Sequence, residues 1–154
     1  MDLLQCFCKC VRNLTEEDLR RYIDTLDRAE SFVKEEHLKQ LFRCMCDPEA
    51  GTSSRRAKPR AIKYLNAAEE AIALREKPTL QNDEERLDRF LGGIDENLEE
   101  EFSNASTDER AAVLEKIAVH YSKLLAETSE YQQFKAKLAD AYKGKIKISR
   151  NPKT

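Results

Sequence analysis

The sequence predicts an all-α protein that folds as a single bundle-like domain of about six helices. Apolar residues recur every three to four positions along most of the chain, which places them on one face of a helix. The 154 residues include only four glycines and four prolines, too few for the many tight turns of an all-β fold. Hydrophobic residues make up 40% and charged residues 36% of the chain. We therefore expect a buried apolar core under a highly charged exterior.

The N-terminal segment, 1–12, is rich in cysteine and is predicted to form a short amphipathic helix. Leu3, Leu4, Phe7 and Val11 share one face at helical spacing. The helical domain is expected to follow over 13–144.

A strong helix start lies at Thr15, whose hydroxyl can accept a hydrogen bond from the first helical turn. Three acidic residues follow it and suit the positive end of the helix dipole. Asp47-Pro48 ends the segment, because the residue before a proline is pushed out of the α region. Ser31 is a point where the helix could restart after a kink, so one long helix and two shorter ones both remain open. The apolar stripe comprises Leu19, Tyr22, Ile23, Leu26, Ala29, Val33, Leu38, Leu41, Phe42 and Met45.

A polar stretch at 47–58 is expected to be a mobile loop. Pro59 suits the first turn of the next helix, and Lys77-Pro78 stops that helix. The alanines in its stripe indicate close approach to another helix. The stripe consists of Ile62, Leu65, Ala68, Ala71 and Ile72.

Two short helices are predicted next. The run Asn82–Glu85 is a capping signal, and Gly92-Gly93 ends the first of these helices. The second carries Ile94, Leu98 and Phe102 at helical spacing. The segment 83–103 holds nine acidic residues and two arginines, a local charge of −7.

The strongest helix prediction follows Ser106, which forms a capping box with Glu109. Ser129 with Gln132 repeats that signature, and the last helix is predicted to end at Gly144. From there the chain is expected to be a basic tail, 145–154. The stripes of these two helices contain Leu114, Ile117, Ala118, Tyr121, Leu124 and Leu125, then Tyr131, Phe134, Leu138, Ala141 and Tyr142.

Five cysteines are the unusual feature of the composition. In one interpretation all five are buried helical residues, because a free cysteine packs like a small hydrophobe. In a second, Cys6, Cys8 and Cys10 are S-acylated. They lie close to the N-terminus among apolar and basic residues, and two acyl chains anchor a protein stably to a membrane.

A third interpretation is a metal–thiolate site, because four thiolates close a tetrahedral zinc shell. Each neighbouring pair has C-x-C spacing, however, and on a helix two such side chains point about 200° apart. We therefore predict no bound metal and no cofactor. The alternative ligand set would be Cys6, Cys8, Cys10, Cys44 and Cys46.

Neither histidine belongs to a recognisable catalytic pattern. His37 lies among charged residues, which predicts a solvated position, and His120 adjoins Tyr121, which predicts a partly buried structural role. The chain has no glycine-rich phosphate loop, calcium loop or Glu-x-x-His pair. We predict that the protein is not an enzyme.

Charge and patterning favour an interaction protein. The net charge of −2 gives no field that would hold nucleic acid, and neither the basic loop nor the tail matches a nucleic-acid module. The acidic segment and the basic segments could instead steer association with a protein partner. We predict a non-enzymatic helical adaptor or regulator, tethered to a membrane by N-terminal S-acylation. The alternative is a small-ligand or metal–thiolate binding protein that uses the bundle interior or the cysteine clusters.

The sequence also predicts a location. No apolar run approaches the roughly 20 residues that span a bilayer, and the N-terminus lacks the features of a signal peptide. We expect a cytoplasmic protein, with peripheral membrane association if the N-terminal cysteines are acylated.

Overall fold

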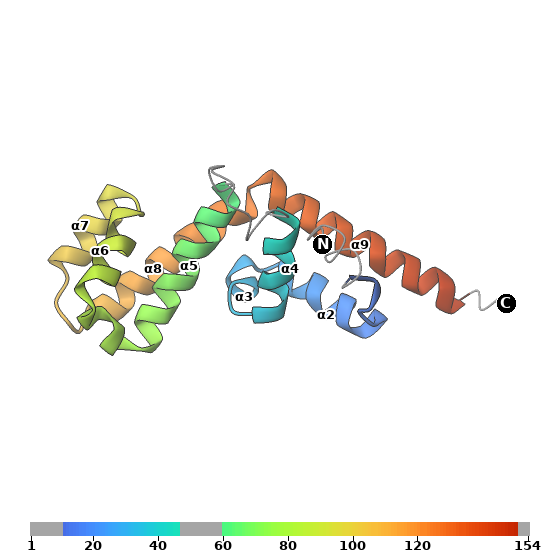
Figure 1. Ribbon diagram of the computed structural model, residues 1–154, viewed down its shortest axis with the longest axis horizontal. Helices are drawn as coiled ribbons and strands as arrows, with labels where there is room; N and C mark the ends of the chain where they lie inside the picture. The colour runs from blue at the N-terminus through green and yellow to red at the C-terminus, as the bar shows by residue number, and fades with distance from the viewer. Residues whose placement is uncertain (1–10, 47–59, 151–154) are drawn as a thin grey trace.

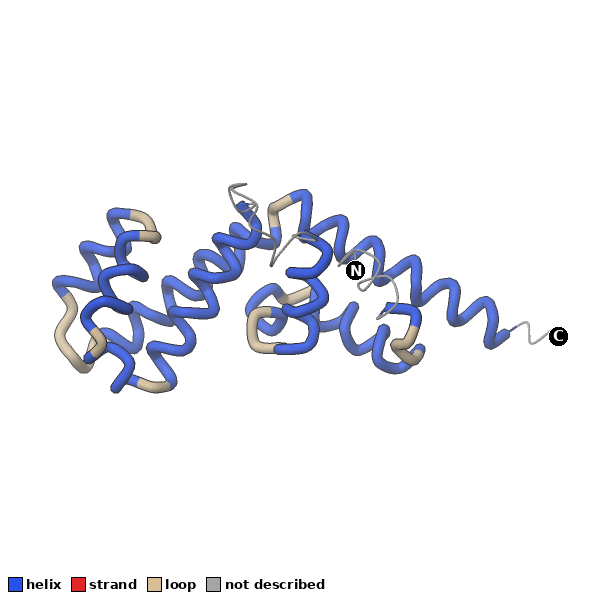
Figure 2. The backbone as a smooth tube through the Cα atoms, viewed as in Figure 1, coloured by secondary structure: helices blue, strands red, loops and turns tan. Residues whose placement is uncertain are grey.

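The computed structural model describes residues 11–46 and 60–150, with side chains through residue 145. Within these ranges the protein is all-helical, which confirms the predicted fold class. The described residues contain eight α-helices and one 3₁₀ helix, more helices than predicted (Figures 1 and 2). The predicted loop at 47–58 and the predicted helix over most of 1–12 lie outside the described residues.

The first apolar stripe divides into three helices rather than one or two. They are α2 (Glu16–Leu26), α3 (Ala29–Phe32) and α4 (Glu36–Cys46). Thr15 is the N-cap of α2, and its Oγ1 accepts a hydrogen bond from the Asp18 backbone N–H at 3.0 Å, as predicted. Phe32 at the end of α3 and Val33, the C-cap that follows it, are both buried.

Helix α5 (Arg60–Glu76) and the 3₁₀ helix η1 (Pro78–Asn82) follow, with the boundary at Lys77-Pro78 as predicted. Helix α5 packs along α8 (Arg110–Ala126) in the most extensive helix–helix contact of the described residues (Figure 1). Ala61, Ala68 and Ala71 of α5 are completely buried. Their small side chains allow the close approach that the sequence indicated.

Two short helices, α6 (Glu84–Gly92) and α7 (Glu96–Asn104), cover the same end of the molecule as α5 and α8 (Figure 1). Asp83 is the N-cap of α6, and its Oδ1 accepts from the Arg86 backbone N–H at 3.2 Å. Asp95 caps α7 in the same way.

The last two helix starts differ in detail from the prediction. The capping box at Ser106 is half formed: the Ser106 backbone N–H donates to Glu109 Oε2 at 3.5 Å, and the helix begins at Arg110. The N-cap hydroxyl of α9 (Ser129–Arg150) belongs to Thr128, whose Oγ1 accepts from the Tyr131 backbone N–H at 3.2 Å. Ser129 is therefore the first helical residue and not the cap.

Helix α9 does not end at Gly144 but continues to Arg150. A glycine inside a helix costs only about 1 kcal/mol relative to alanine. The lysines and isoleucines that follow Gly144 tolerate helical backbone, so this cost does not stop the helix. Residues 145–150, predicted as part of a tail, are thus helical.

Helices α8 and α9 follow one another along the long axis of the molecule, with a break at Glu127–Thr128 (Figures 1 and 2). Helices α2 and α4 pack against α9, and α5 and α7 pack against α8. The buried residues of both ends form one continuous hydrophobic core. No helix among the described residues combines the length and the apolar character needed to cross a bilayer.

Four aromatic residues form the centre of the α2–α4 and α9 end. Phe32, Phe42, Tyr131 and Phe134 pack with ring centroids 5.3 to 6.3 Å apart, a spacing at which aromatic pairs attract one another. The buried Tyr131 hydroxyl donates to the Leu26 carbonyl oxygen, which ties α9 to the end of α2. Burial raises the pKa of this hydroxyl well above its ordinary value, so it remains a donor at all physiological pH values.

Candidate functional site: a cavity between α5 and α6

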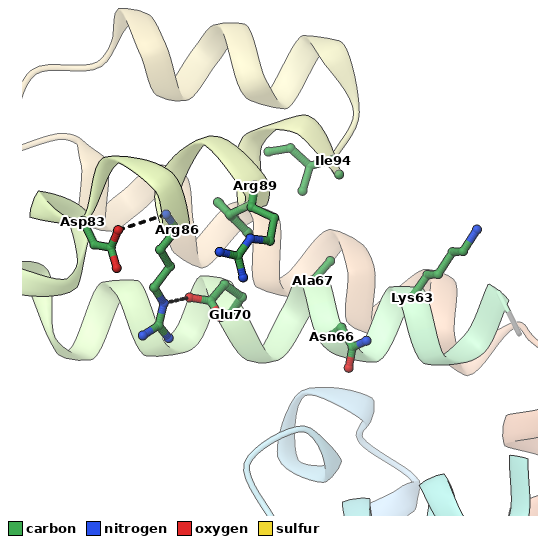
Figure 3. A pocket seen from close by; sticks show the side chains of 10 residues that line it. Lys63, Asn66, Ala67, Glu70, Asp83, Arg86, Arg89 and Ile94 are labelled. Carbon is green, nitrogen blue, oxygen red and sulfur yellow. Dashed lines mark hydrogen bonds and ion pairs between the residues drawn. The ribbon is translucent and has the colours of Figure 1, made fainter. Parts of the chain in front are cut away.

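An open cavity of about 760 Å³ lies between α5 and α6 (Figure 3). Helix α5 contributes Lys63, Asn66, Ala67 and Glu70 to its wall. These positions follow the i, i+3, i+4, i+7 spacing, so they form one face of the helix. Because the alanine face of α5 is buried, with α8 packed along the helix, this second face is left for the cavity. We refer to it below as the α5–α6 cavity.

The opposite wall comes from α6 and the turns at its two ends. Asp83, Arg86 and Arg89 line it at intervals of three residues, together with Phe90 and, beyond the helix, Gly93 and Ile94. The side chains of Arg86 and Arg89 point from α6 toward α5 (Figure 3).

One ion pair joins the two walls. Arg86 Nε donates to Glu70 Oε1 at 2.6 Å. This hydrogen bond raises the pKa of Arg86, so its guanidinium is charged at every accessible pH. Asp83 is also engaged, because its carboxylate caps α6. In the described structure the Arg86 Nη groups donate to no protein acceptor, so they are available to a bound group.

Two further cations on the rim are weakly engaged. Arg89 Nη2 lies 3.7 Å from Glu85 Oε1, and the two side chains are 75% and 89% exposed. An exposed pair of this kind contributes little stability. Lys63 is exposed and forms no ion pair with any described residue.

Apolar atoms complete the lining. Ala67 is half-buried, whereas Phe90 and Ile94 are largely buried in the core beneath. A concave surface of several hundred Å³ with apolar contact area and a few polar groups is typical of a binding site. The α5–α6 cavity can therefore hold an apolar side chain while its rim binds charged groups.

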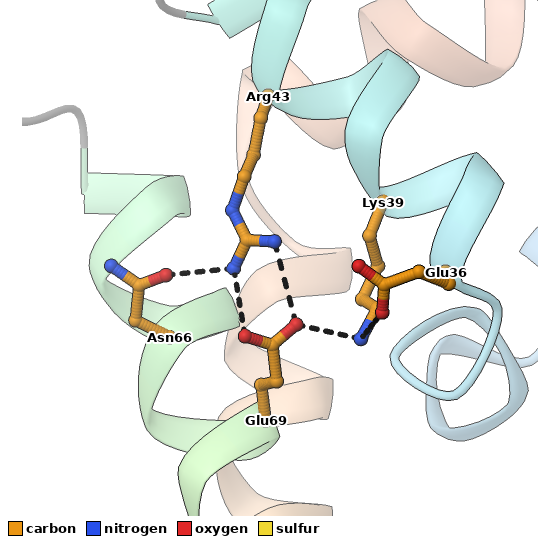
Figure 4. Close-up of polar contacts among 5 residues, drawn as sticks. All are labelled: Glu36, Lys39, Arg43, Asn66 and Glu69. Atoms are coloured by element: carbon orange, nitrogen blue, oxygen red, sulfur yellow. Dashed lines mark hydrogen bonds and ion pairs between the residues drawn. The ribbon is translucent and has the colours of Figure 1, made fainter. Parts of the chain in front are cut away.

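A polar network lies on the neighbouring face of α5 and links it to α4 (Figure 4). Lys39 Nζ donates to Glu69 Oε2 at 2.6 Å and lies 3.1 Å from Glu36 Oε2. Arg43 Nη2 donates to Glu69 Oε1 at 3.2 Å and to Asn66 Oδ1 at 2.8 Å. Asn66 thus belongs both to this network and to the wall of the α5–α6 cavity.

Glu69 is the centre of the network. Burial raises the pKa of its carboxyl group, but the hydrogen bonds and charges of Lys39 and Arg43 lower it by more, so the net pKa is below its usual value. The carboxylate is therefore ionised when it bridges the two cations. The Lys39 side chain is only 6% exposed, so this amine depends on Glu69 for compensation of its buried charge.

A second cavity, of about 250 Å³, lies near the start of α8. Arg75 and Arg110 both line it, and Arg75 is paired with Glu115. Arg110 stacks its guanidinium over the Phe102 ring at 4.9 Å, and its buried Nε has no hydrogen-bond partner in the described structure. This second cavity is smaller than the α5–α6 cavity, which is therefore the larger of the two candidate sites.

The structure describes only part of the predicted cysteine sites. Cys6, Cys8 and Cys10 lie outside the described residues. Cys44 and Cys46 are half-buried near the end of α4 and pack against the core. Over residues 11–46 and 60–150, no group of three or more histidine, cysteine, aspartate or glutamate side chains is arranged to hold a metal ion.

The two histidines do not come together. His37 is exposed as predicted, and its Nδ1 is hydrogen-bonded to the Tyr22 hydroxyl at 2.6 Å. His120 is exposed, so the prediction of a partly buried position was wrong. The neighbouring Tyr121 takes the buried position and accepts a hydrogen bond from the Asp95 backbone N–H. Consecutive side chains on a helix point about 100° apart, so His120 faces solvent while Tyr121 faces the core.

None of the cavity residues was predicted from the sequence to belong to a binding site. The sequence pattern that corresponds to the cavity is a mixed polar face on α5, opposite its alanine face, and two arginines three residues apart on α6. Neither pattern indicates a site until α5 and α6 are known to be neighbours.

A scan against protein-family models, a search of curated proteins and a search of solved structures each found no match to this chain.

Proposed function

We propose that this chain is a non-enzymatic helical adaptor or regulator that binds a protein partner in the α5–α6 cavity. The observation that carries the proposal is the cavity itself: an open concavity with apolar contact area and a rim of charged side chains of both signs. The Glu70–Arg86 ion pair holds its two walls together before any partner binds. Such preorganisation lowers the conformational cost of binding.

Membrane tethering through S-acylation of Cys6, Cys8 and Cys10 is part of this proposal. The chain enters the described structure at Val11, and the Lys145 side chain donates to the Arg12 carbonyl oxygen at 2.7 Å. Lys145, near the end of α9, is therefore next to the segment that follows the three cysteines. Acyl chains and basic residues at one place form the two signals that stable anchoring requires.

The partner proposal is tested by site-specific photo-crosslinking of the full chain in its own cells. A photo-reactive residue is placed at Gly93, which lines the cavity and has space for a side chain. Gly144 on α9 is the control, because a side chain there meets nothing within 4 Å, and a Cβ at Gly93 makes only ordinary contacts of 3.6 Å with two backbone oxygens. We expect one discrete protein adduct from Gly93, absent from Gly144.

A cavity-filling variant, Ala67→Trp, should abolish the Gly93 adduct while the helical content and the melting temperature stay close to those of the wild type. Equal adducts from both positions, or none from Gly93, contradict the proposal.

The tether is tested by the intact mass of the native protein before and after hydroxylamine, which cleaves thioesters. We expect an added acyl mass that disappears. A native mass equal to that of the unmodified chain contradicts the tether and leaves the partner proposal standing.

One observation favours the alternative of a small-ligand protein. A volume of about 760 Å³ falls within the size of small-molecule sites. Native mass spectrometry with elemental analysis separates the alternatives. A stoichiometric small molecule that Ala67→Trp displaces favours the ligand form, and stoichiometric zinc or copper with masked thiols favours the metal–thiolate form.

A further inference from the structure

We propose that the second cavity, at the start of α8, binds a tetrahedral oxyanion of the phosphate class. This site is separate from the α5–α6 cavity and needs no protein partner. The end of α5, the 3₁₀ helix η1 and the start of α8 meet there (Figure 1). Two arginines, an asparagine, a glutamine and a threonine supply the polar side chains of its lining, and no lining residue is acidic. We refer to it below as the Arg110 cavity.

Arg110 brings a positive charge that no described carboxylate neutralises. Its guanidinium lies over the Phe102 ring at 4.9 Å, and its buried Nε has no hydrogen-bond partner among the described residues. The two Nη groups are not buried, and they too have no acceptor in the part of the chain that the structure describes. A planar guanidinium with free Nη groups matches the oxygen atoms of a phosphate. Arg110 can therefore bind one at the cavity wall.

Further donors surround this charge. Asn82 and Thr107 line the cavity with an amide and a hydroxyl group, and neither side chain is hydrogen-bonded to a described residue. Arg75 is half-buried and is paired with Glu115, so it adds donor groups without adding net charge. The net charge of the cavity wall therefore comes from Arg110.

The backbone at the two helix ends also favours an anion. The Ala111 N–H, in the first turn of α8, donates to no described carbonyl oxygen, and such groups at helix N-termini attract anions. At the end of α5, the Leu74 carbonyl oxygen already accepts from Gln81 Nε2 at 3.2 Å. The neighbouring Asp108 and Glu109 do not line the cavity. The cavity therefore presents mainly donors to a bound group.

The size of the Arg110 cavity selects a small ligand. Its volume of about 250 Å³ lies below the roughly 300–1,000 Å³ of sites for drug-sized molecules. A single oxyanion fits such a space, either as free phosphate or as the terminal group of a phosphate ester whose remainder stays in solvent.

The test titrates the purified full chain with inorganic phosphate, by isothermal calorimetry and ³¹P NMR. Ionic strength is held constant because salt screens charges near the surface. We expect one saturable site in the millimolar range or tighter, and binding of acetate weaker by at least about threefold, because acetate has fewer charges and oxygen atoms. Glycerol 3-phosphate separates the two sources. Affinity equal to or above that of phosphate identifies an ester ligand, and weaker binding identifies the free ion.

Three variants locate the ion. Arg110→Met keeps an apolar side chain against the Phe102 ring and should weaken phosphate binding at least about tenfold, because it removes charge-assisted hydrogen bonds. Thr107→Val, at an exposed residue, should weaken binding about threefold. Arg89→Met is the matched control. It removes an exposed arginine that lines the α5–α6 cavity and should leave the affinity unchanged.

No saturable phosphate binding, equal binding of acetate, or undiminished binding by folded Arg110→Met overturns the proposal. A loss in Arg89→Met without a loss in Arg110→Met also overturns it, because that result places the ion in the α5–α6 cavity. If Arg110→Met has lost its helical circular dichroism, Thr107→Val decides the matter, and an affinity equal to that of the wild type then rejects the site.

Discussion

Glu69→Gln is expected to destabilise the protein by about 2 kcal/mol. Glu69 bridges Lys39 at 2.6 Å and Arg43 at 3.2 Å, and it joins α5 to α4. Removing one partner of a fully buried ion pair costs about 3–5 kcal/mol, because it leaves an uncompensated charge. The Lys39 side chain is 6% exposed but that of Glu69 is 37% exposed. Solvent therefore screens part of the interaction, and Glu36 still faces Lys39, which reduces the expected loss.

The assay is urea unfolding of the purified full chain at neutral pH, followed by circular dichroism. Lys39→Met removes the buried charge instead of its partner. The double variant should then be more stable than the sum of the two single losses predicts, by about 1 kcal/mol or more. Glu85→Gln is the surface control and should change stability by less than about 0.5 kcal/mol. A loss for Glu69→Gln no larger than that of this control, or a coupling energy near zero, refutes the role assigned to the network.

Three further predictions concern stability. The Glu69 carboxyl has a lowered pKa in the folded state, so its contribution to folding stability is present above its unfolded pKa, near 4.5, and is lost as the pH falls through the folded value. In urea unfolding, Glu69→Gln should therefore lose less stability below pH 4.5 than the wild type does. An identical pH profile for the two proteins contradicts this. Tyr131→Phe leaves the buried Leu26 carbonyl without its side-chain donor and should cost about 1–3 kcal/mol in the same assay, whereas no change would show that the bond is dispensable. Thr128→Ala removes the α9 cap and should lower the free energy of unfolding by about 1 kcal/mol, while Ser129→Ala should change it little. A larger loss for Ser129→Ala than for Thr128→Ala would identify Ser129 as the cap.

Local chemistry made most helix positions predictable. The Thr15 cap, the stop at Lys77-Pro78 and the Gly92-Gly93 end depend on neighbours within one turn, and the structure has all three. One error arose where two local signals competed. Thr128 and Ser129 are adjacent and both suit an N-cap, and the Tyr131 backbone N–H donates to the Thr128 hydroxyl.

The candidate site could not be predicted in the same way. Lys39 and Glu69 are thirty residues apart in the chain, and an isolated sequence gives no sign that they meet. The same is true of Arg86 and Glu70. Helical periodicity shows which face of each helix is apolar, but it does not show which helices become neighbours. The cavity depends on that pairing.

We propose that a protein partner binds in the α5–α6 cavity, and mapping of photo-adducts by mass spectrometry, with the reactive residue at Gly93 or at Gly144, is the decisive experiment. We expect one partner peptide crosslinked from Gly93 and lost in Ala67→Trp. A Gly93 adduct that survives Ala67→Trp, or one that forms equally from Gly144, would contradict it.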